Sequence, residues 1–331
     1  MGWSHWRLAT EGAVRASRRS PPSGGAYMRG AFIEADRLCK RYGDVAALSE
    51  LTFASRARIL ALVGPNGAGK TTFVKISTCL LKPSSGRLRV LGLDVQDESR
   101  SLKRRISLLP QDASPDSGCT PLEHVTYYLF SRGYGLGEAR RRAREVLEEV
   151  GLWEHRDVQC LKLSGGMKRL VMLAMALAPE VDAIFLDEPT SGLDPVNKVK
   201  AWGLITRLAR EGVHVLVTSH DMEEVEERAE EVVMINRGRL VTQGPPQELV
   251  SKVSGLACIE AALSRAQARE ELLEALKGLD GVVRVCRLGA TVMAYVDERR
   301  VAEVAGRVSE VGLDVRIRKC GLRDVFLLNV L

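Results

Sequence analysis

The sequence has no long apolar run. Its longest apolar stretches, such as ILALVG and VMLAMALA, fall well short of the roughly 18 residues that span a bilayer, so we expect no membrane-spanning segment. Its seven cysteines include no C-x-x-C pair, which argues against a disulfide framework and a zinc site and fits a reducing cytoplasm. No internal repeat divides the chain. Any role at a membrane would therefore need a partner.

The composition is that of an ordinary globular protein, with 45% hydrophobic and 27% charged residues. The 331 residues suffice for one large domain or two unequal ones, given about 150 residues per domain. The formal net charge of +6 is compatible with acidic lipid or nucleic acid nearby, but it is more typical of a solvated surface.

Residues 1–29 are rich in Arg, Ser, Gly and Pro, and they show neither apolar periodicity nor the apolar core of a signal peptide. We interpret them as a disordered basic tail. Structured sequence begins directly after Met28, which leaves two interpretations. Either translation starts at Met28, which we favour, or the tail is a basic arm that touches membrane lipid.

Two regions with regular patterns follow the tail. In residues 31–250, short apolar runs alternate with amphipathic helices, which predicts an α/β domain with a mainly parallel sheet. Residues 256–331 have the pattern of a smaller α+β domain. Its strand and helix patterns alternate in the order βαββαβ, which predicts a ferredoxin-like fold, and they lie at 257–263, 264–276, 282–288, 291–297, 299–311 and 315–320.

The strongest chemical signal is GPNGAGKTT, which follows a buried strand pattern, ILALV, and precedes a helical one. Glycines let successive backbone N–H groups point at phosphate oxygens, and the helix N-terminus adds positive potential. Lys70 can place a full charge on the β and γ phosphates, and the Thr71 hydroxyl can ligate Mg²⁺. We predict a phosphate-binding loop rather than a turn without function, made of Gly64, Pro65, Asn66, Gly67, Ala68, Gly69, Lys70, Thr71 and Thr72.

Two adjacent carboxylates follow another buried strand pattern, AIFL, at the edge where open α/β sheets bind ligands. Asp187 can hold the Mg²⁺ shell, while Glu188 can orient and deprotonate a water for in-line attack on a γ-phosphate. The alternative is a charged strand end that faces solvent. We favour that alternative less, because the same sequence also contains a phosphate-binding loop. Further on, Asp194 and Pro195 have the form of a helix N-cap with proline at the first helical position.

A third strand pattern, VHVLVTSH, ends at His220. A lone histidine is usually structural. Because this one follows a third parallel strand, we expect it to contact the γ-phosphate and to help hold the water and Glu188 in place.

These motifs stand in the order found in the ATP-binding cassette (ABC) ATPases, and the chain resembles that family over residues 32–250. GPNGAGKTT is similar to the Walker A loop, AIFLDE to Walker B, SGLD to the D-loop, and His220 to the switch histidine. Tyr42 resembles the aromatic residue on which adenine stacks, the alternative being an ordinary strand-end tyrosine. Gln111, in LLPQD, resembles the Q-loop glutamine, which touches Mg²⁺ or the water and couples the site to a partner.

The segment LSGGM resembles the signature that separates this family from other P-loop ATPases. Ser164, Gly165 and Gly166 lie just before the helical run MKRLVMLAMALA, so their hydroxyl and N–H groups can receive a second face of the γ-phosphate. The resemblance implies that this loop completes the site of the opposite subunit, with ATP between two cassettes arranged head to tail. The alternative is a helix N-terminus preceded by a flexible turn.

Residues 112–163 have the pattern of a helix-rich insert. In ABC transporters this region forms the groove for a cytoplasmic helix of the membrane subunit. TPLEHVTYYLFSRGYG, and the C-terminal GLRDVFLLNVL, are similar to drug-export, ABC-2 type ATPases. Two features depart from that subgroup. SRARIL stands before the Walker A strand in place of the usual glycine and glutamate, and Arg323 stands where an acidic residue is common. The basic run EARRRAREVL has no interleaved aromatics, which favours a solvated helix face over a nucleic-acid patch.

The resemblance implies an ATP-hydrolysing subunit of an ABC exporter that uses ATP and Mg²⁺. The implied partners, at the cytoplasmic face of the cell membrane, are a second ATP-binding subunit and integral membrane permease subunits, and no nucleic acid is expected. The alternative is a soluble ABC ATPase acting on a ribosome or nucleic acid, but such proteins usually carry two cassettes in one chain. A non-catalytic regulatory module is disfavoured by Glu188 and His220. The substrate is not readable, because the membrane subunit mainly selects it.

Overall fold

The computed structural model describes residues 30–262, 272–276, 278–310 and 315–330, and these divide into two compact units. The first unit holds the described residues up to Asp221 together with Arg228–Gln243. The second holds Met222–Glu227 and the described residues from Gly244 onward. The N-terminal tail expected at residues 1–29 lies outside the described residues.

A six-stranded sheet forms the centre of the first unit, in the order β10-β9-β3-β8-β7-β6. All neighbouring pairs from β9 to β6 are parallel, so the carboxyl ends of these strands meet at one edge. Every residue of β3 and β7 is buried, which explains why both read as continuous apolar runs. The strands are β3 (Ile59–Val63), β6 (Ile106–Leu109), β7 (Ala183–Asp187), β8 (His214–Ser219), β9 (Glu231–Asn236) and β10 (Arg239–Gly244).

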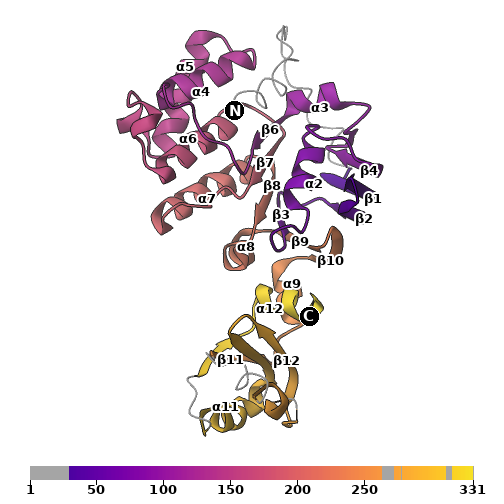
Figure 1. The fold of residues 1–331 in the computed structure, drawn as a ribbon. Coiled ribbons are helices and arrows are strands. Elements are labelled where there is room, and N and C mark those ends of the chain that lie inside the picture. The colour runs from indigo at the N-terminus through magenta and orange to yellow at the C-terminus, as the bar shows by residue number, and fades with distance from the viewer. Residues whose placement is uncertain (1–29, 263–271, 277, 311–314, 331) are drawn as a thin grey trace. The chain divides into compact units, whose positions relative to one another are not determined.

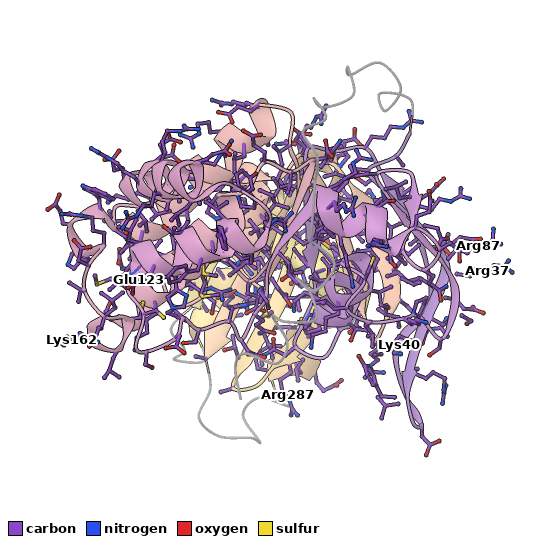
Figure 2. The ribbon with its side chains drawn as sticks, turned by 90° about the horizontal axis from the view of Figure 1, so that it is seen from above. Arg37, Lys40, Arg87, Glu123, Lys162 and Arg287 are labelled. Atoms are coloured by element: carbon purple, nitrogen blue, oxygen red, sulfur yellow. The ribbon has the colours of Figure 1, made fainter. Side chains whose placement is uncertain are left out.

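A second sheet in this unit is antiparallel between its paired strands and has the order β2-β1-β4-β5. One face packs into a core that also contains Leu60, Phe73 and Phe185. The other face carries charge, and Figure 2 shows Arg37 and Arg87 reaching outward from it. The strands are β1 (Ile33–Tyr42), β2 (Val45–Ser55), β4 (Ser85–Val90) and β5 (Leu93–Asp94).

The helices of this unit stand around the parallel sheet, and Figure 1 shows α4, α5 and α6 grouped near the edge strand β6. The start of α4 is fixed by a capping box, in which Thr120 and Glu123 each bond the other's backbone N–H. The helices that begin in this unit are α2 (Lys70–Ser77), α3 (Ser99–Arg105), α4 (Pro121–Ser131), α5 (Leu136–Glu149), α6 (Gly165–Leu177) and α7 (Pro195–Arg210). The short α8 (Met222–Arg228) follows.

The basic run of the insert lies on α5. Arg141 pairs with Glu145 at 2.7 Å and Arg144 with Glu148 at 2.8 Å, each one helical turn apart. These arginines are about 60% exposed. The pairing fits the solvated helix face that the sequence favours.

The second unit is built on a four-stranded antiparallel sheet in the order β12-β13-β11-β14. Of the helix expected over 264–276, the structure describes 272–276, and these five residues are helical. The helix expected from about 299 begins at Val301, because Glu298–Arg300 form a 3₁₀ turn capped by Asp297. The elements are α9 (Pro246–Ser251), β11 (Leu256–Ala262), β12 (Val282–Leu288), β13 (Thr291–Asp297), α11 (Val301–Glu310), β14 (Val315–Lys319) and α12 (Leu322–Val330).

A buried carboxylate, Asp324, joins α12 to the sheet of this unit. It accepts hydrogen bonds from both terminal nitrogens of Arg318, at 2.6 and 2.9 Å, and from the Tyr295 hydroxyl at 3.0 Å. Burial alone would raise the Asp324 pKa, but the bonds from Arg318, the Gly321 N–H and Tyr295 together lower it. The neighbouring Arg323 is exposed, so its departure from the drug-export pattern does not touch this cluster.

Candidate active site

The Walker A loop connects β3 to α2. Gly69 has a φ of 107°, and a Cβ added there would lie 2.5 Å from the Ala47 carbonyl oxygen of β2, so only glycine fits. The Lys70 Nζ donates to the carbonyl oxygens of Gly64 at 2.7 Å and Pro65 at 3.2 Å. Pro65, Asn66 and Gly67 form the exposed part of the loop, Ala68 is buried, and Thr72 lies in the first turn of α2.

The Lys70 ammonium lies near the two strand-end carboxylates. Burial lowers the Lys70 pKa, while the charges of Glu188 and Asp187 oppose that shift. Only 6% of Lys70 is exposed. The loop therefore holds a largely desolvated positive charge beside the two carboxylates.

Three oxygen-bearing side chains gather beside the lysine. The Thr71 Oγ1 donates to the Gln111 Oε1 at 3.1 Å, which joins the start of α2 to the segment after β6. Asp187 ends β7 and is 1% exposed. Burial raises the Asp187 pKa, and the hydrogen bond from Thr218 and the charge of Lys70 oppose that rise. The hydroxyl, amide and carboxylate oxygens are of the type that Mg²⁺ prefers.

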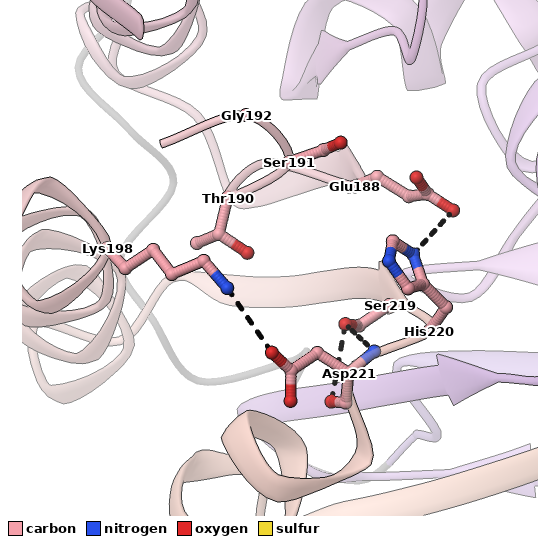
Figure 3. A pocket seen from close by; sticks show the side chains of 8 residues that line it. All are labelled: Glu188, Thr190, Ser191, Gly192, Lys198, Ser219, His220 and Asp221. Atoms are coloured by element: carbon pink, nitrogen blue, oxygen red, sulfur yellow. Dashed lines mark hydrogen bonds and ion pairs between the residues drawn. The ribbon is translucent and has the colours of Figure 1, made fainter. Parts of the chain in front are cut away.

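Glu188 and His220 lie just past the ends of the neighbouring strands β7 and β8. The His220 Nδ1 is 3.4 Å from the Glu188 Oε1, as Figure 3 shows. Across the same pocket, Lys198 pairs with Asp221 at 3.3 Å. The pocket is lined by Glu188, Thr190, Ser191, Gly192, Lys198, Ser219, His220 and Asp221.

The backbone of Glu188 is held in an unusual conformation. Its φ is 51°, in the left-handed region that non-glycine residues rarely adopt. Its N–H donates to the Thr218 Oγ1 at 2.9 Å, and the same hydroxyl donates to an Asp187 carboxylate oxygen. Thr218 therefore joins both carboxylate residues to β8.

The signature residues stand at the start of α6. The Ser164 Oγ accepts from the Met167 N–H at 3.2 Å, so Ser164 is the N-cap of the helix. A Cβ added at Gly165 would meet no atom within 4 Å, and at Gly166 none closer than 3.7 Å. Neither glycine has a positive φ. Nothing in the surrounding fold of the described residues therefore requires glycine at these two positions.

Tyr42 belongs to the antiparallel sheet. It ends β1, its side chain is half-exposed, and the Lys40 Nζ lies 5.4 Å from its ring centroid. The structure thus brings the Walker A residues, Gln111, Asp187, Glu188 and His220 together, whereas the described contacts of Tyr42 and Ser164 are to Lys40 and Met167. An adenine contact by Tyr42 stays a prediction.

Sequence reasoning missed two residues at this site, Thr218 and Arg169. Thr218 is a hydroxyl at the end of a buried strand pattern. Arg169 is a buried charge at the start of the apolar run of α6, and its guanidinium donates to the backbone carbonyls of Gln111 and Glu188. A polar side chain on an otherwise apolar buried element was the available signal in each case.

Known proteins resemble this chain over most of its length. A family model described as ABC transporter matches residues 50–191. The daunorubicin/doxorubicin resistance ATP-binding protein DrrA of Streptomyces peucetius is 34% identical over 301 residues, covering 89% of this chain and 91% of that protein. The Nod factor export ATP-binding protein I of Burkholderia thailandensis is 35% identical over 301 residues, covering 89% and 95%. The chain belongs to the ABC transporter family.

Solved structures support this family assignment. An ATP-binding subunit of an ABC transporter superposes with a TM-score of 0.61 at 25% identity, covering 67% of this chain and 92% of that one. A dimeric ATP-binding cassette in a post-hydrolysis state, bound to ADP and Pi, gives 0.59 at 26% identity, covering 64% and 98%. This ABC protein is accordingly an ATP-binding protein and an ATPase. In the part of the chain that the structure describes, no helix has the length and apolarity needed to cross a membrane.

Proposed function

We propose that this ABC protein hydrolyses ATP to drive export through separate transmembrane subunits, at the cytoplasmic face of the membrane. The observation that carries the proposal is the Glu188–His220 contact at two adjoining strand ends, beside Asp187 and the Walker A lysine. The similarity to proteins named for drug resistance and Nod factor export supports export over import. The same names favour a transporter over a soluble ATPase acting on a ribosome or nucleic acid.

The site residues divide the chemistry among them. The Walker A N–H groups and Lys70 bind the β and γ phosphates. Thr71, Gln111 and Asp187 fit a hard cation and would hold Mg²⁺, which when bound neutralises charge on the transferring phosphoryl group. Glu188 orients the attacking water and accepts its proton, and His220 holds the Glu188 carboxylate and the γ-phosphate in place.

The second half of each site comes from a partner subunit. Because neither packing nor backbone conformation requires glycine at Gly165, the glycine is explained by the close approach of another molecule. Ser164, Gly165 and Gly166 then donate to the γ-phosphate bound by the opposite Walker A loop. The dimeric state of the similar cassette supports the pairing of two chains.

The membrane subunits dock on the helical insert at 112–163. Tyr127 and Phe130 lie on α4 and are 58% and 59% exposed, and Leu161 between α5 and α6 is 65% exposed. Large exposed apolar side chains on one element are typical of interaction sites. They would receive a cytoplasmic helix of the permease.

Residues 31–250 form the ABC domain in this proposal, and residues 256–331 form an accessory domain of ferredoxin-like topology. The strand order β12-β13-β11-β14 and the helix between β13 and β14 support that topology.

The substitution Glu188→Gln tests the proposal. It keeps the size of the side chain but removes the base, so hydrolysis should slow by about 100-fold or more. ATP affinity should stay within about threefold of the wild type, because Lys70 and the Walker A backbone are unchanged. The measurements are steady-state ATPase rates and binding of a fluorescent ATP analogue. Wild-type turnover by this variant would remove Glu188 from the mechanism.

A further inference from the structure

Arg169 connects two segments of the active site that are distant in the sequence. Its Nη1 donates to the carbonyl oxygens of Pro110 at 3.2 Å and Gln111 at 2.9 Å, in the segment after β6. Its Nη2 donates to the carbonyl oxygens of Asp187 at 2.8 Å and Glu188 at 2.7 Å, at the end of β7. Arg169 itself lies in α6, five residues after Ser164.

All five N–H donors of this guanidinium have a partner. The fifth bond runs from the Nε to the Pro189 carbonyl oxygen at 3.4 Å. The residue is 8% exposed, and burial lowers its pKa, although the charges of Asp187 and Glu188 raise it. A planar fork with five donors can satisfy carbonyls from two segments at once, whereas a lysine has three donors at a single point.

The peptide units that Arg169 holds are those on which hydrolysis depends. Glu188 has a φ of 51°, so its side-chain direction requires a backbone that is fixed from outside. Thr218 binds the Glu188 N–H, and Arg169 binds the Glu188 carbonyl oxygen. Without Arg169, the Glu188 carbonyl oxygen would keep only its bond from the Ser191 N–H at 3.2 Å, so the strained peptide could relax and the carboxylate could turn away from His220.

We propose that Arg169 is a positioning residue for hydrolysis, which holds the backbone of Glu188 and Gln111 in the arrangement that the attack on ATP requires. The inference rests on the proposed ATPase mechanism. The start of α6 then has two roles. Its signature loop serves the site of the opposite subunit, and Arg169 serves the site of its own chain. Arg169 does not touch ATP or water, and it acts through Glu188 and Gln111.

Two variants of Arg169 and one control test the inference. Arg169→Met removes all five donors, and Arg169→Lys keeps the charge but loses the fork. We expect kcat to fall on the order of 10- to 100-fold in both variants, since small displacements of catalytic groups have such effects. The dissociation constant of a fluorescent ATP analogue should stay within about threefold, because the Walker A loop is not bound by Arg169.

The matched control is Arg142→Met. Arg142 lies on α5, is 18% exposed, and donates to the Ala178 carbonyl oxygen at the far end of α6 at 3.2 Å. It is a partly buried arginine bonded to a backbone carbonyl, but it does not contact the strand ends. We expect this variant to keep its kcat within about twofold of the wild type.

A double variant separates positioning from a general structural role. If Arg169 acts through Glu188, adding Arg169→Met to Glu188→Gln should lower the remaining single-turnover rate by less than about threefold. An additive loss would overturn the inference. So would unchanged kcat in both Arg169 variants, or loss of folding and ATP binding together with kcat in both. A failure of the wider mechanism is distinguishable, because Glu188→Gln alone would then hydrolyse ATP at the wild-type rate.

Discussion

Glu188 has a backbone conformation that is unfavourable for its residue type. The left-handed region costs a non-glycine residue about 1–2 kcal/mol, so the φ of 51° must be stabilised by neighbours. Its N–H bonds the carbonyl and hydroxyl oxygens of Thr218, and its carbonyl oxygen accepts from the Ser191 N–H and from Arg169. Strain of this kind concentrates at functional sites. It indicates that the fold controls the direction of the Glu188 side chain.

Sequence patterns predicted the strand-end cluster but not the residues that hold it. Lys70, Asp187 and Glu188 could be found because their residue type and their place after a strand suffice. Arg169 could not be assigned, because its partners lie 58 and 19 residues away and are backbone carbonyls of other residues. Such contacts become visible only when the chain is folded.

Thr218→Val should impair the site without changing the fold. The Asp187 carboxylate loses a hydrogen bond that lowers its pKa, so burial should raise that pKa further. A protonated Asp187 cannot ligate Mg²⁺, and activity is lost as the pH falls through its pKa. The acid limb of the kcat/KM profile should therefore move to higher pH. The rate at neutral pH should fall about tenfold.

Thr218→Ser is the matched control, because it keeps the hydroxyl. Its acid limb should coincide with that of the wild type. Identical pH profiles for the Val and Ser variants would show that the hydroxyl does not set the Asp187 pKa.

At the scale of elements, the buried strands were predictable and one helix end was not. ILALV and AIFL read as strands buried on both faces, and β3 and β7 are buried throughout. The helical pattern that follows the Walker A lysine, TTFVKISTCLL, runs to Leu81, but α2 ends at Ser77. There the Ser77 and Thr78 hydroxyls bond back to carbonyls of the preceding turn, and Cys79 has a φ of 58°. Neither glycine nor proline occurs at Ser77–Leu81 to indicate the end of α2 in the sequence.

The exposed face of α4 should be needed for membrane association and not for hydrolysis. Tyr127→Ser with Phe130→Ser should reduce copurification with a polytopic membrane protein at least about tenfold, because interface aromatics contribute strongly to binding. The ATPase rate of the isolated chain should stay within about twofold. The measurement is affinity purification from solubilised membranes.

Leu136→Ser is the control for that experiment, since Leu136 is an equally exposed apolar residue on α5 at 55%. It should leave copurification unchanged. Equal losses in both variants would disfavour α4 as the docking surface. Cosedimentation of the wild-type chain with ribosomal particles, and none with membranes, would favour the soluble alternative instead.

Asp324→Asn should destabilise the second unit. Breaking a buried ion pair costs on the order of 3 kcal/mol, and the Asp324 carboxylate is 0% exposed beside Arg318. Because the folded-state pKa is lowered, the stabilisation is fully present above the unfolded value of about 3.9 and is lost as the pH falls through the folded value. The variant should therefore differ from the wild type most at pH 7.

Hydrogen exchange of β11 and β13 amides in the full chain measures this effect. The control is Asp280→Asn, which removes an ion pair to Arg300 at 2.6 Å whose carboxylate is 84% exposed. Exposed pairs contribute little, so exchange should barely change. Equal protection losses in the two variants would contradict a special role for the buried cluster.

At the scale of the whole molecule, the arrangement of the motifs fits a site completed by a second copy. Walker A, Walker B and His220 converge at one sheet edge, while Ser164 bonds only to α6 among the described residues. A two-fold symmetric dimer can unite the signature of each chain with the Walker A loop of the other. This pairing could be inferred from the family resemblance, but not from local patterns, because nothing in one chain specifies its partner's position.

Mixing two inactive variants tests that pairing. Lys70→Ala destroys the phosphate loop of its own chain. Gly165→Asp places a carboxylate where the partner's γ-phosphate must bind, and a Cβ added there meets no atom within 4 Å, so we expect the fold to tolerate it. Each homodimer should be inactive. Gly137→Asp, at a helical glycine on α5 that is equally open, should retain full ATPase and controls for the added charge.

In a head-to-tail dimer of the two variants, one composite site carries both defects and the other carries none. With random pairing half of the dimers are mixed, and each keeps one of its two sites, so the mixture should recover up to roughly a quarter of the wild-type ATPase rate. A tethered dimer with one wild-type and one Lys70→Ala protomer establishes first that a single intact site can hydrolyse ATP. If that dimer is active and the mixture is silent, the Walker A loop and the signature loop serve ATP within the same chain, and the head-to-tail arrangement is wrong.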